Sequence, residues 1–169
     1  NNRQDVFRKP ADFDAFVRVL QQAAEDVPVR VLAFCLMPNH FHLLVRITSN
    51  QFSEGMHALG TSYAKSVSQE MGWTGALFES RFQAKQVDEL GYLLHLSRYI
   101  HLNPATAHLV MHSQDWEYSS YPDFIGLRRG TLCTKQILLQ EFRNAGEYRR
   151  FVESRVEPRI DLSPYLFDE

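Results

Sequence analysis

The sequence predicts an α+β fold in which helices pack on a central antiparallel sheet. Two apolar runs of strand length, residues 29–37 and 40–47, flank a Pro-Asn turn signal and predict an antiparallel hairpin. Apolar residues at helical spacing over residues 10–26 and 89–102 predict helices that each bury one face. With 169 residues, the chain is long enough for one domain with a sizeable core.

The composition excludes several classes of protein. No apolar run approaches membrane-spanning length, and no signal-peptide pattern is present. Cys35 and Cys133 lie far apart and outside any Cys-x-x-Cys spacing, which favours a reducing, cytoplasmic setting and argues against a cysteine-based zinc site. The formal net charge of −2 argues against binding of long duplex DNA through the overall charge of the protein. It allows a small, locally basic groove.

The first half of the chain gives clear signals for element boundaries. Pro10 suits the first turn of a helix. The run 29–37 is apolar on both faces apart from Arg30, so we expect an inner strand. A second helix should follow an N-cap at Ser53 and end at Gly72.

Further along, residues 75–87 end in an alternating pattern that predicts a strand with a polar, partly basic face. Such a face either lies on a solvent-exposed edge strand or binds the phosphate backbone of a nucleic acid, and the sequence leaves both open. The helix 89–102 should stop before Pro104, since the residue before a proline resists helical geometry. Beyond Gly130 the pattern is again helical and predicts a C-terminal appendage.

The second strand of the hairpin begins with two histidines. Because strand side chains alternate, His40 and His42 share one face. Two imidazoles at this spacing can converge on one divalent metal, although ordinary hydrogen-bonded histidines would also explain a lone His-x-His. Tyr99 and Asn103 are neighbours one helical turn apart, on a different side from the leucines. A metal on two imidazoles and a side-chain oxygen can polarise a phosphate, which a tyrosine hydroxyl could attack; Tyr92 is the rival nucleophile.

Four motifs carry a resemblance to a known family. MPNHFHLLV, RFQAKQV, RYIHLNPATAHLV and WEYSSY, in this order, resemble the REP-associated tyrosine transposases, bacterial IS200-like members of the HUH (His-hydrophobe-His) single-tyrosine group. The resemblance covers most of residues 1–125. It implies a ferredoxin-like α/β fold with a central antiparallel sheet (the HUH endonuclease fold). It also implies cleavage and joining of single-stranded DNA near hairpins, with Mg²⁺ or Mn²⁺.

Carried over by position, the resemblance assigns roles to individual residues. His40 and His42 become metal ligands, Asn103 the third ligand, and Tyr99 the nucleophile that forms a covalent 5′-phosphotyrosine. His95 and His101 could touch the metal but are expected at the surface or beside the ligands. The residues expected to bind DNA are Arg3, Arg81, Gln83 and Lys85.

The resemblance also implies the protein's surroundings and organisation. The partner would be single-stranded or hairpin DNA of REP-like repeats in the bacterial cytoplasm, near the nucleoid, with the protein acting as a monomer or homodimer. The transposase domain would span residues 1–127 and a helical extension residues 128–169. Family members carry a strand before the opening Asn-Asn-Arg-Gln loop; without it, an inner slot of the sheet would stay empty or be filled by another segment.

Two other functions fit parts of the sequence. A domesticated, catalytically silent DNA-hairpin-binding protein would keep the same motifs. An unrelated His-x-His metalloenzyme of cupin type would need an all-β barrel, and the helical patterns around Phe13 and Tyr99 argue against it.

Overall fold

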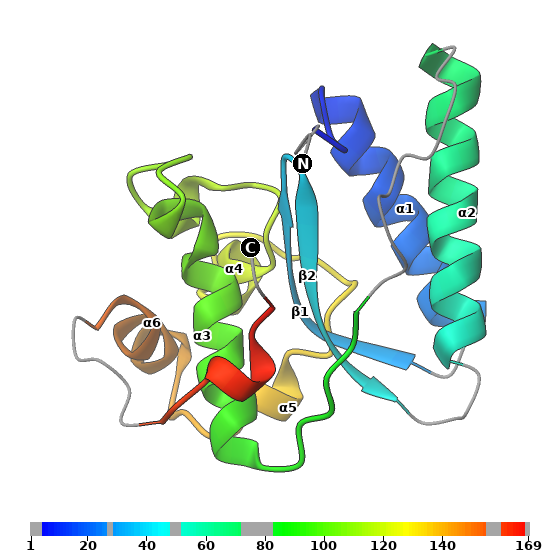
Figure 1. Ribbon diagram of the computed structural model, residues 1–169. Helices are drawn as coiled ribbons and strands as arrows, with labels where there is room; N and C mark the ends of the chain where they lie inside the picture. The colour runs from blue at the N-terminus through cyan, green and yellow to red at the C-terminus, as the bar shows by residue number, and fades with distance from the viewer. Residues whose placement is uncertain (1–4, 27–28, 48–51, 72–82, 155–159, 168–169) are drawn as a thin grey trace. The chain divides into compact units, whose positions relative to one another are not determined.

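The computed structural model describes residues 5–26, 29–47, 52–71, 83–154 and 160–167 (Figure 1). Helices and a small antiparallel sheet are mixed, so the predicted combination of α and β structure is confirmed. The elements that matter for the site are, in chain order, α1 (Pro10–Asp26), β1 (Val29–Met37), β2 (His40–Ile47), α2 (Phe52–Met71), α3 (Leu90–Thr106), η1 (Ser113–Asp115), α4 (Tyr121–Phe124), α5 (Gln136–Leu139), α6 (Ala145–Glu153) and η2 (Ser163–Tyr165).

The hairpin of β1 and β2 forms as the apolar runs predict, with Pro38 and Asn39 in the turn. Residues 31–37 are buried on both faces, which confirms the expectation of an inner strand. Among the described residues, the named sheet contains these two strands only. The helix α1 begins and ends where the sequence predicted.

The second neighbour of β1 is a segment that the sequence did not predict as a strand. Cys35 forms an isolated antiparallel bridge with Ser119. The N–H of Leu36 donates to the Tyr118 carbonyl at 2.9 Å, and the N–H of Ser120 donates to the Phe34 carbonyl at 3.0 Å. These bonds satisfy the outer edge of β1, which explains how the strand can be buried on both sides.

The chain divides into two compact units. The first contains α1, α2, the hairpin turn and the open end of the hairpin. Its core is aromatic: Phe7 stacks on Phe13 at 4.8 Å between ring centroids, and Tyr63 meets Phe16 edge-on at 5.1 Å. The Tyr63 hydroxyl donates to the Val6 carbonyl at 3.2 Å, so this buried phenol is satisfied.

The helix α2 begins at Phe52, so Ser53 is its second residue and the predicted N-cap at Ser53 is wrong by two positions. The predicted end at Gly72 lies outside the described residues. No helix in the described ranges is long and apolar enough to cross a membrane.

The second unit contains the middle of the hairpin and the described residues from Gln83 onward. Its first residues correct a prediction, because Gln83, Ala84 and Lys85 are exposed and belong to no strand. An alternating strand needs an apolar face to bury, and Ala84 buries nothing here. The other residues of the alternation, Arg81 and Phe82, lie outside the described part of the chain.

The helix α3 also corrects a prediction, because it continues past Pro104 to Thr106. A proline removes one N–H, here the donor that would reach the Ile100 carbonyl. Backbone bonding then resumes: the N–H of Ala107 donates to Asn103 at 2.8 Å and that of Leu109 to Pro104 at 2.9 Å. One missing bond so close to the helix end does not stop the helix, and Asn103 lies within it.

Beyond Gly130 the chain forms the short helices α5 and α6. Leu138, Tyr148 and Val152 are fully buried, and α6 packs on α3 within the second unit. The division of the chain into a domain at residues 1–127 and an extension stays a prediction.

Candidate metal and tyrosine site

The two histidines of the site lie on β2. His40 and His42 are alternate residues of one strand and therefore share a face, and both are partly buried. Nδ1 of His40 lies 2.7 Å from Oδ1 of Asn39, so the ring nitrogen donates to the amide oxygen. This bond places the lone pair of His40 on Nε2, the tautomer that a metal ligand needs. The sequence offered Asn39 only as a turn residue, although its place directly before His40 was visible.

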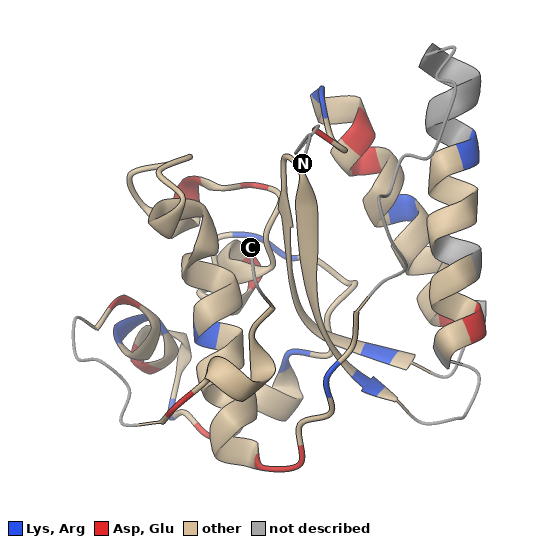
Figure 2. Ribbon diagram, in the orientation of Figure 1, with Lys and Arg blue, Asp and Glu red and all other residues tan. Residues whose placement is uncertain are grey.

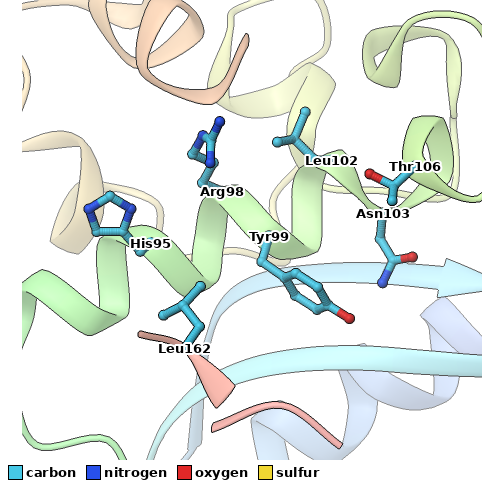
Figure 3. A pocket seen from close by; sticks show the side chains of 7 residues that line it. All are labelled: His95, Arg98, Tyr99, Leu102, Asn103, Thr106 and Leu162. Carbon is cyan, nitrogen blue, oxygen red and sulfur yellow. The ribbon is translucent and has the colours of Figure 1, made fainter. Parts of the chain in front are cut away.

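His42 meets the helix α3. Nδ2 of Asn103 lies 2.8 Å from Nε2 of His42, and the rings of Tyr99 and His42 are 5.7 Å apart at their centroids, inclined by 80°. Figure 3 shows the phenol of Tyr99 and the carboxamide of Asn103 projecting from the same side of α3. The structure thus brings together three of the four predicted residues, while the convergence of His40 with them stays a prediction.

The distance between His42 and Asn103 fits two neighbouring ligands of one cation. Two donor atoms about 2.1 Å from an ion and at right angles lie about 3 Å apart. The amide oxygen and nitrogen exchange places by a half-turn of the carboxamide, which would present Oδ1 in place of Nδ2. Among the described residues no group of three His, Cys, Asp or Glu side chains could hold a metal ion. The expected ligands, His40, His42 and Asn103, form a neutral donor set. A neutral set would leave the full charge of the cation available to a phosphate.

A pocket of about 220 Å³ opens beside Tyr99. Figure 3 shows the phenol directed away from His95 and toward the side of Asn103. His95 instead packs its ring edge-on against Phe151 at 5.2 Å. Burial, and then the charge of Arg98, hold the pKa of His95 below its usual value. The residues lining the pocket are His95, Arg98, Tyr99, Leu102, Asn103, Thr106 and Leu162.

The rival nucleophile, Tyr92, lies elsewhere on α3. Its ring packs against Tyr165 at 4.8 Å between centroids. Of the two tyrosines, Tyr99 is the one in ring contact with His42.

The predicted DNA-binding residues are only partly described. Gln83 and Lys85 are exposed, whereas Arg3 and Arg81 lie outside the described residues. Nζ of Lys85 donates to the Leu166 carbonyl and lies 5.0 Å from the ring centroid of Phe167.

His101 corrects a further expectation, because it is fully buried and is therefore not a surface residue. Its ring nitrogens bond to Ser120 and Tyr148, so the residue belongs to the packing behind α3.

Comparison with known families agrees with the motifs. The family described as "Transposase IS200 like" matches residues 1–103, more than half of the 169-residue chain. The chain belongs to the family of IS200-like transposases, which confirms the resemblance seen in the sequence. Its class is therefore that of DNA-binding proteins of transposition and DNA recombination. No curated protein and no solved structure matches.

Proposed function

We propose that the chain is a metal-dependent single-stranded DNA endonuclease and strand transferase. It cleaves at or near DNA hairpins through a covalent 5′-phosphotyrosine on Tyr99. The family supplies the reaction class, and one observation carries the assignment of residues: His42, Tyr99 and Asn103 meet at one place. Such a step needs a phenol, an imidazole and an amide close together: here the amide and the imidazole lie at hydrogen-bonding distance, and the phenol ring packs edge-on against the imidazole.

In the proposed step, Oη of Tyr99 attacks the phosphorus of a phosphodiester. The P–Oη bond forms, the bond from phosphorus to the 3′ oxygen breaks, and the freed strand ends in a 3′ hydroxyl. The phenol loses one proton and the leaving oxygen gains one, so the step is balanced. Attack by a second 3′ hydroxyl reverses it and joins strands, because the phosphodiester energy is retained. A bound Mg²⁺ or Mn²⁺ would polarise the phosphate and stabilise developing charge.

The chain's own residues hold the reactants. His40, His42 and Asn103 would bind the cation, and Asn39 would keep His40 in the required tautomer. The HUH fold, the domain boundary at residue 127, REP-like hairpin DNA as partner and a place near the nucleoid are part of the same proposal. So are DNA contacts from Arg3, Arg81, Gln83 and Lys85.

The test uses single-stranded oligonucleotides that form hairpins, labelled at the 3′ end and incubated with the protein and Mn²⁺. A 5′-phosphotyrosine retains the 3′ fragment, so a labelled protein band should survive denaturing electrophoresis. Tyr99→Phe should lose this band and keep DNA binding, while the matched variant Tyr92→Phe should retain both. A band that persists in Tyr99→Phe would remove Tyr99 from the role. DNA binding with no attachment in the parent protein would identify the silent hairpin binder.

A further inference from the structure

The helix α3 has two polar faces with different partners. Tyr99 and Asn103 are four residues apart, as are Ser97 and His101, so each pair lies on one face. At 100° per residue the two pairs point about 160° apart around the helix axis. The front pair belongs to the proposed site, and the back pair is buried.

The back face carries a chain of hydrogen bonds. Nε2 of His101 lies 2.7 Å from Oγ of Ser120, and Nδ1 lies 2.7 Å from the hydroxyl of Tyr148 on α6. The same hydroxyl lies 3.0 Å from Oγ of Ser97. All four side chains are fully buried, so every one of these bonds matters to the fold.

The number of protons available shows which group donates in each of these hydrogen bonds. Ser97 donates its single proton to the Leu94 carbonyl at 2.7 Å, so Tyr148 is the donor in its contact with Ser97. Tyr148 then offers only a lone pair to His101, whose Nδ1 must carry the ring proton. A neutral ring leaves Nε2 unprotonated, so Nε2 accepts from Oγ of Ser120 at 2.7 Å, a shorter contact than the 3.2 Å from that oxygen to the Phe34 carbonyl. Burial agrees with this state, because it lowers the pKa of His101 to about 3.

This series of hydrogen bonds ends on the hairpin. The N–H of Phe34 on β1 donates to Oγ of Ser120 at 3.0 Å. The strand β1 pairs with β2, which carries His42. The helix α3 is therefore linked to the hairpin on both faces: through Asn103 and His42 in front, and through His101, Ser120 and Phe34 behind.

Arg98, the residue before Tyr99, links α3 to the helix α6. It is the only Lys, Arg, Asp or Glu in α3 (Figure 2). Its guanidinium donates to three carbonyls at the end of α6: from Nε to Phe151 and to Val152, each at 3.1 Å, and from Nη2 to Ser154 at 2.6 Å. A cation on terminal helix carbonyls satisfies orphan acceptors and favours the negative end of the helix.

We infer that Arg98 and His101 are positioning residues, which with α6 fix the rotation of α3 so that Tyr99 and Asn103 face His42. Apolar packing alone tolerates small rotations and slides, whereas directional bonds at several points around the helix do not. The consequence for cleavage rests on the proposed function, but the orientation of Tyr99 does not. The segment after residue 128 thus gains a role in supporting the tyrosine helix.

The direct test places 3-fluorotyrosine at position 99 and records its ¹⁹F resonance without DNA or metal. The parent protein should give one narrow line. Arg98→Ala should shift or broaden it, and Arg98→Lys should restore it in part, since a single ammonium nitrogen replaces two guanidinium nitrogens, Nε and Nη2, that reach the carbonyls from different places. The matched control is Arg149→Ala, which removes an exposed arginine of α6 that pairs with Glu153. A line in folded Arg98→Ala identical to that of the parent overturns the inference.

Tyr148→Phe gives a second, gentler variant, because it removes one hydroxyl and keeps the ring. It too should move the fluorine line, and an unmoved line in this folded variant counts against the inference. The rate of covalent attachment at saturating oligonucleotide should fall about tenfold to a hundredfold in both variants, with oligonucleotide affinity unchanged. Weakened affinity with an unchanged fluorine line would make Arg98 a phosphate contact instead. If the parent protein attaches to no DNA, the proposed function fails while the fluorine result still decides the positioning role.

Discussion

The carboxamide of Asn103 lies 2.8 Å from Nε2 of His42, although the two residues are 61 positions apart in the sequence. The contact joins the tyrosine helix to the histidine strand at the place where the chemistry is proposed. A half-turn of the carboxamide would place Oδ1 of Asn103 there, at the separation from Nε2 that neighbouring ligands of one cation require.

Asn103→Ala should weaken Mn²⁺ binding by about tenfold or more, since it removes one of three protein ligands. Asn103→Asp should strengthen it, because a carboxylate is a charged oxygen ligand. Calorimetric titration of Mn²⁺ into the free protein measures both without DNA. Thr106→Ala, one turn further along α3 and in the same pocket, serves as the control and should bind Mn²⁺ as the parent does. Equal affinity in all four proteins would remove Asn103 from the ligand set.

Asn39→Ala should lower Mn²⁺ affinity by about 10–100-fold without removing a ligand. Its side-chain oxygen accepts the Nδ1 proton of His40 at 2.7 Å, and partners of this kind orient metal-binding histidines. Asn39→Asp keeps an acceptor at the same turn position and should bind close to the parent level. The same calorimetric titration applies, and a loss of affinity in Asn39→Asp as large as in Asn39→Ala would argue against the tautomer explanation.

Local rules predicted most of what lies near the site. The hairpin and α1 follow from apolar runs and helical periodicity, and the shared face of His40 and His42 follows from strand alternation. The pairing of Tyr99 with Asn103 follows from helical spacing. The prediction that α3 would stop before Pro104 was wrong. The cost of a proline depends on how many helical bonds remain beyond it, and here only the last turn follows.

Long-range partners could not be read from the sequence. The neighbour of β1 at residues 118–120 has no alternating pattern, and its bonds to the strand are set by tertiary packing. His101 was expected at the surface or beside the metal ligands, and its burial could not be predicted because it depends on Tyr148, 47 residues later in the sequence. In the alternation that ends at residue 87, the described residues 83–87 form no strand, and a short polar alternation with an exposed Ala84 is too weak a pattern to predict one.

Lys85→Gln should weaken binding of a labelled hairpin oligonucleotide and reduce its salt dependence. If Lys85 contacts one phosphate, the slope of log K against log salt should fall in magnitude by about 0.7 for a single strand. Binding measured at several salt concentrations gives the slope. Lys65→Gln, an exposed lysine of α2, is the matched control. An unchanged slope in Lys85→Gln would leave this lysine with its contacts to Leu166 and Phe167 alone.

Asp123 is a buried acid of the second unit and should make its stability sensitive to low pH. Arg128 donates two hydrogen bonds of 2.8 Å to the Asp123 carboxylate, and the N–H of Gly130 donates to the same carboxylate at 2.8 Å. Burial alone would raise the pKa of Asp123, but the bonds from Arg128 and Gly130 and the charges of Arg128 and Lys135 hold it below the usual value. A pKa lowered by folding means that the carboxylate stabilises the protein above its unfolded pKa, near 4. This stabilisation is lost as the pH falls through the folded value.

Asp123→Asn should therefore lower the free energy of unfolding by about 1–3 kcal/mol at pH 7, as expected for loss of hydrogen bonds to a charged group. The difference from the parent should shrink below about pH 4, where the parent's carboxylate takes up a proton. Urea titrations at pH 7, 5 and 3.5 follow the change. Asp115→Asn, at an exposed position, should leave stability within about 0.5 kcal/mol at each pH. A difference between Asp123→Asn and the parent that grows toward low pH would show that the carboxylate is held mainly in its protonated form.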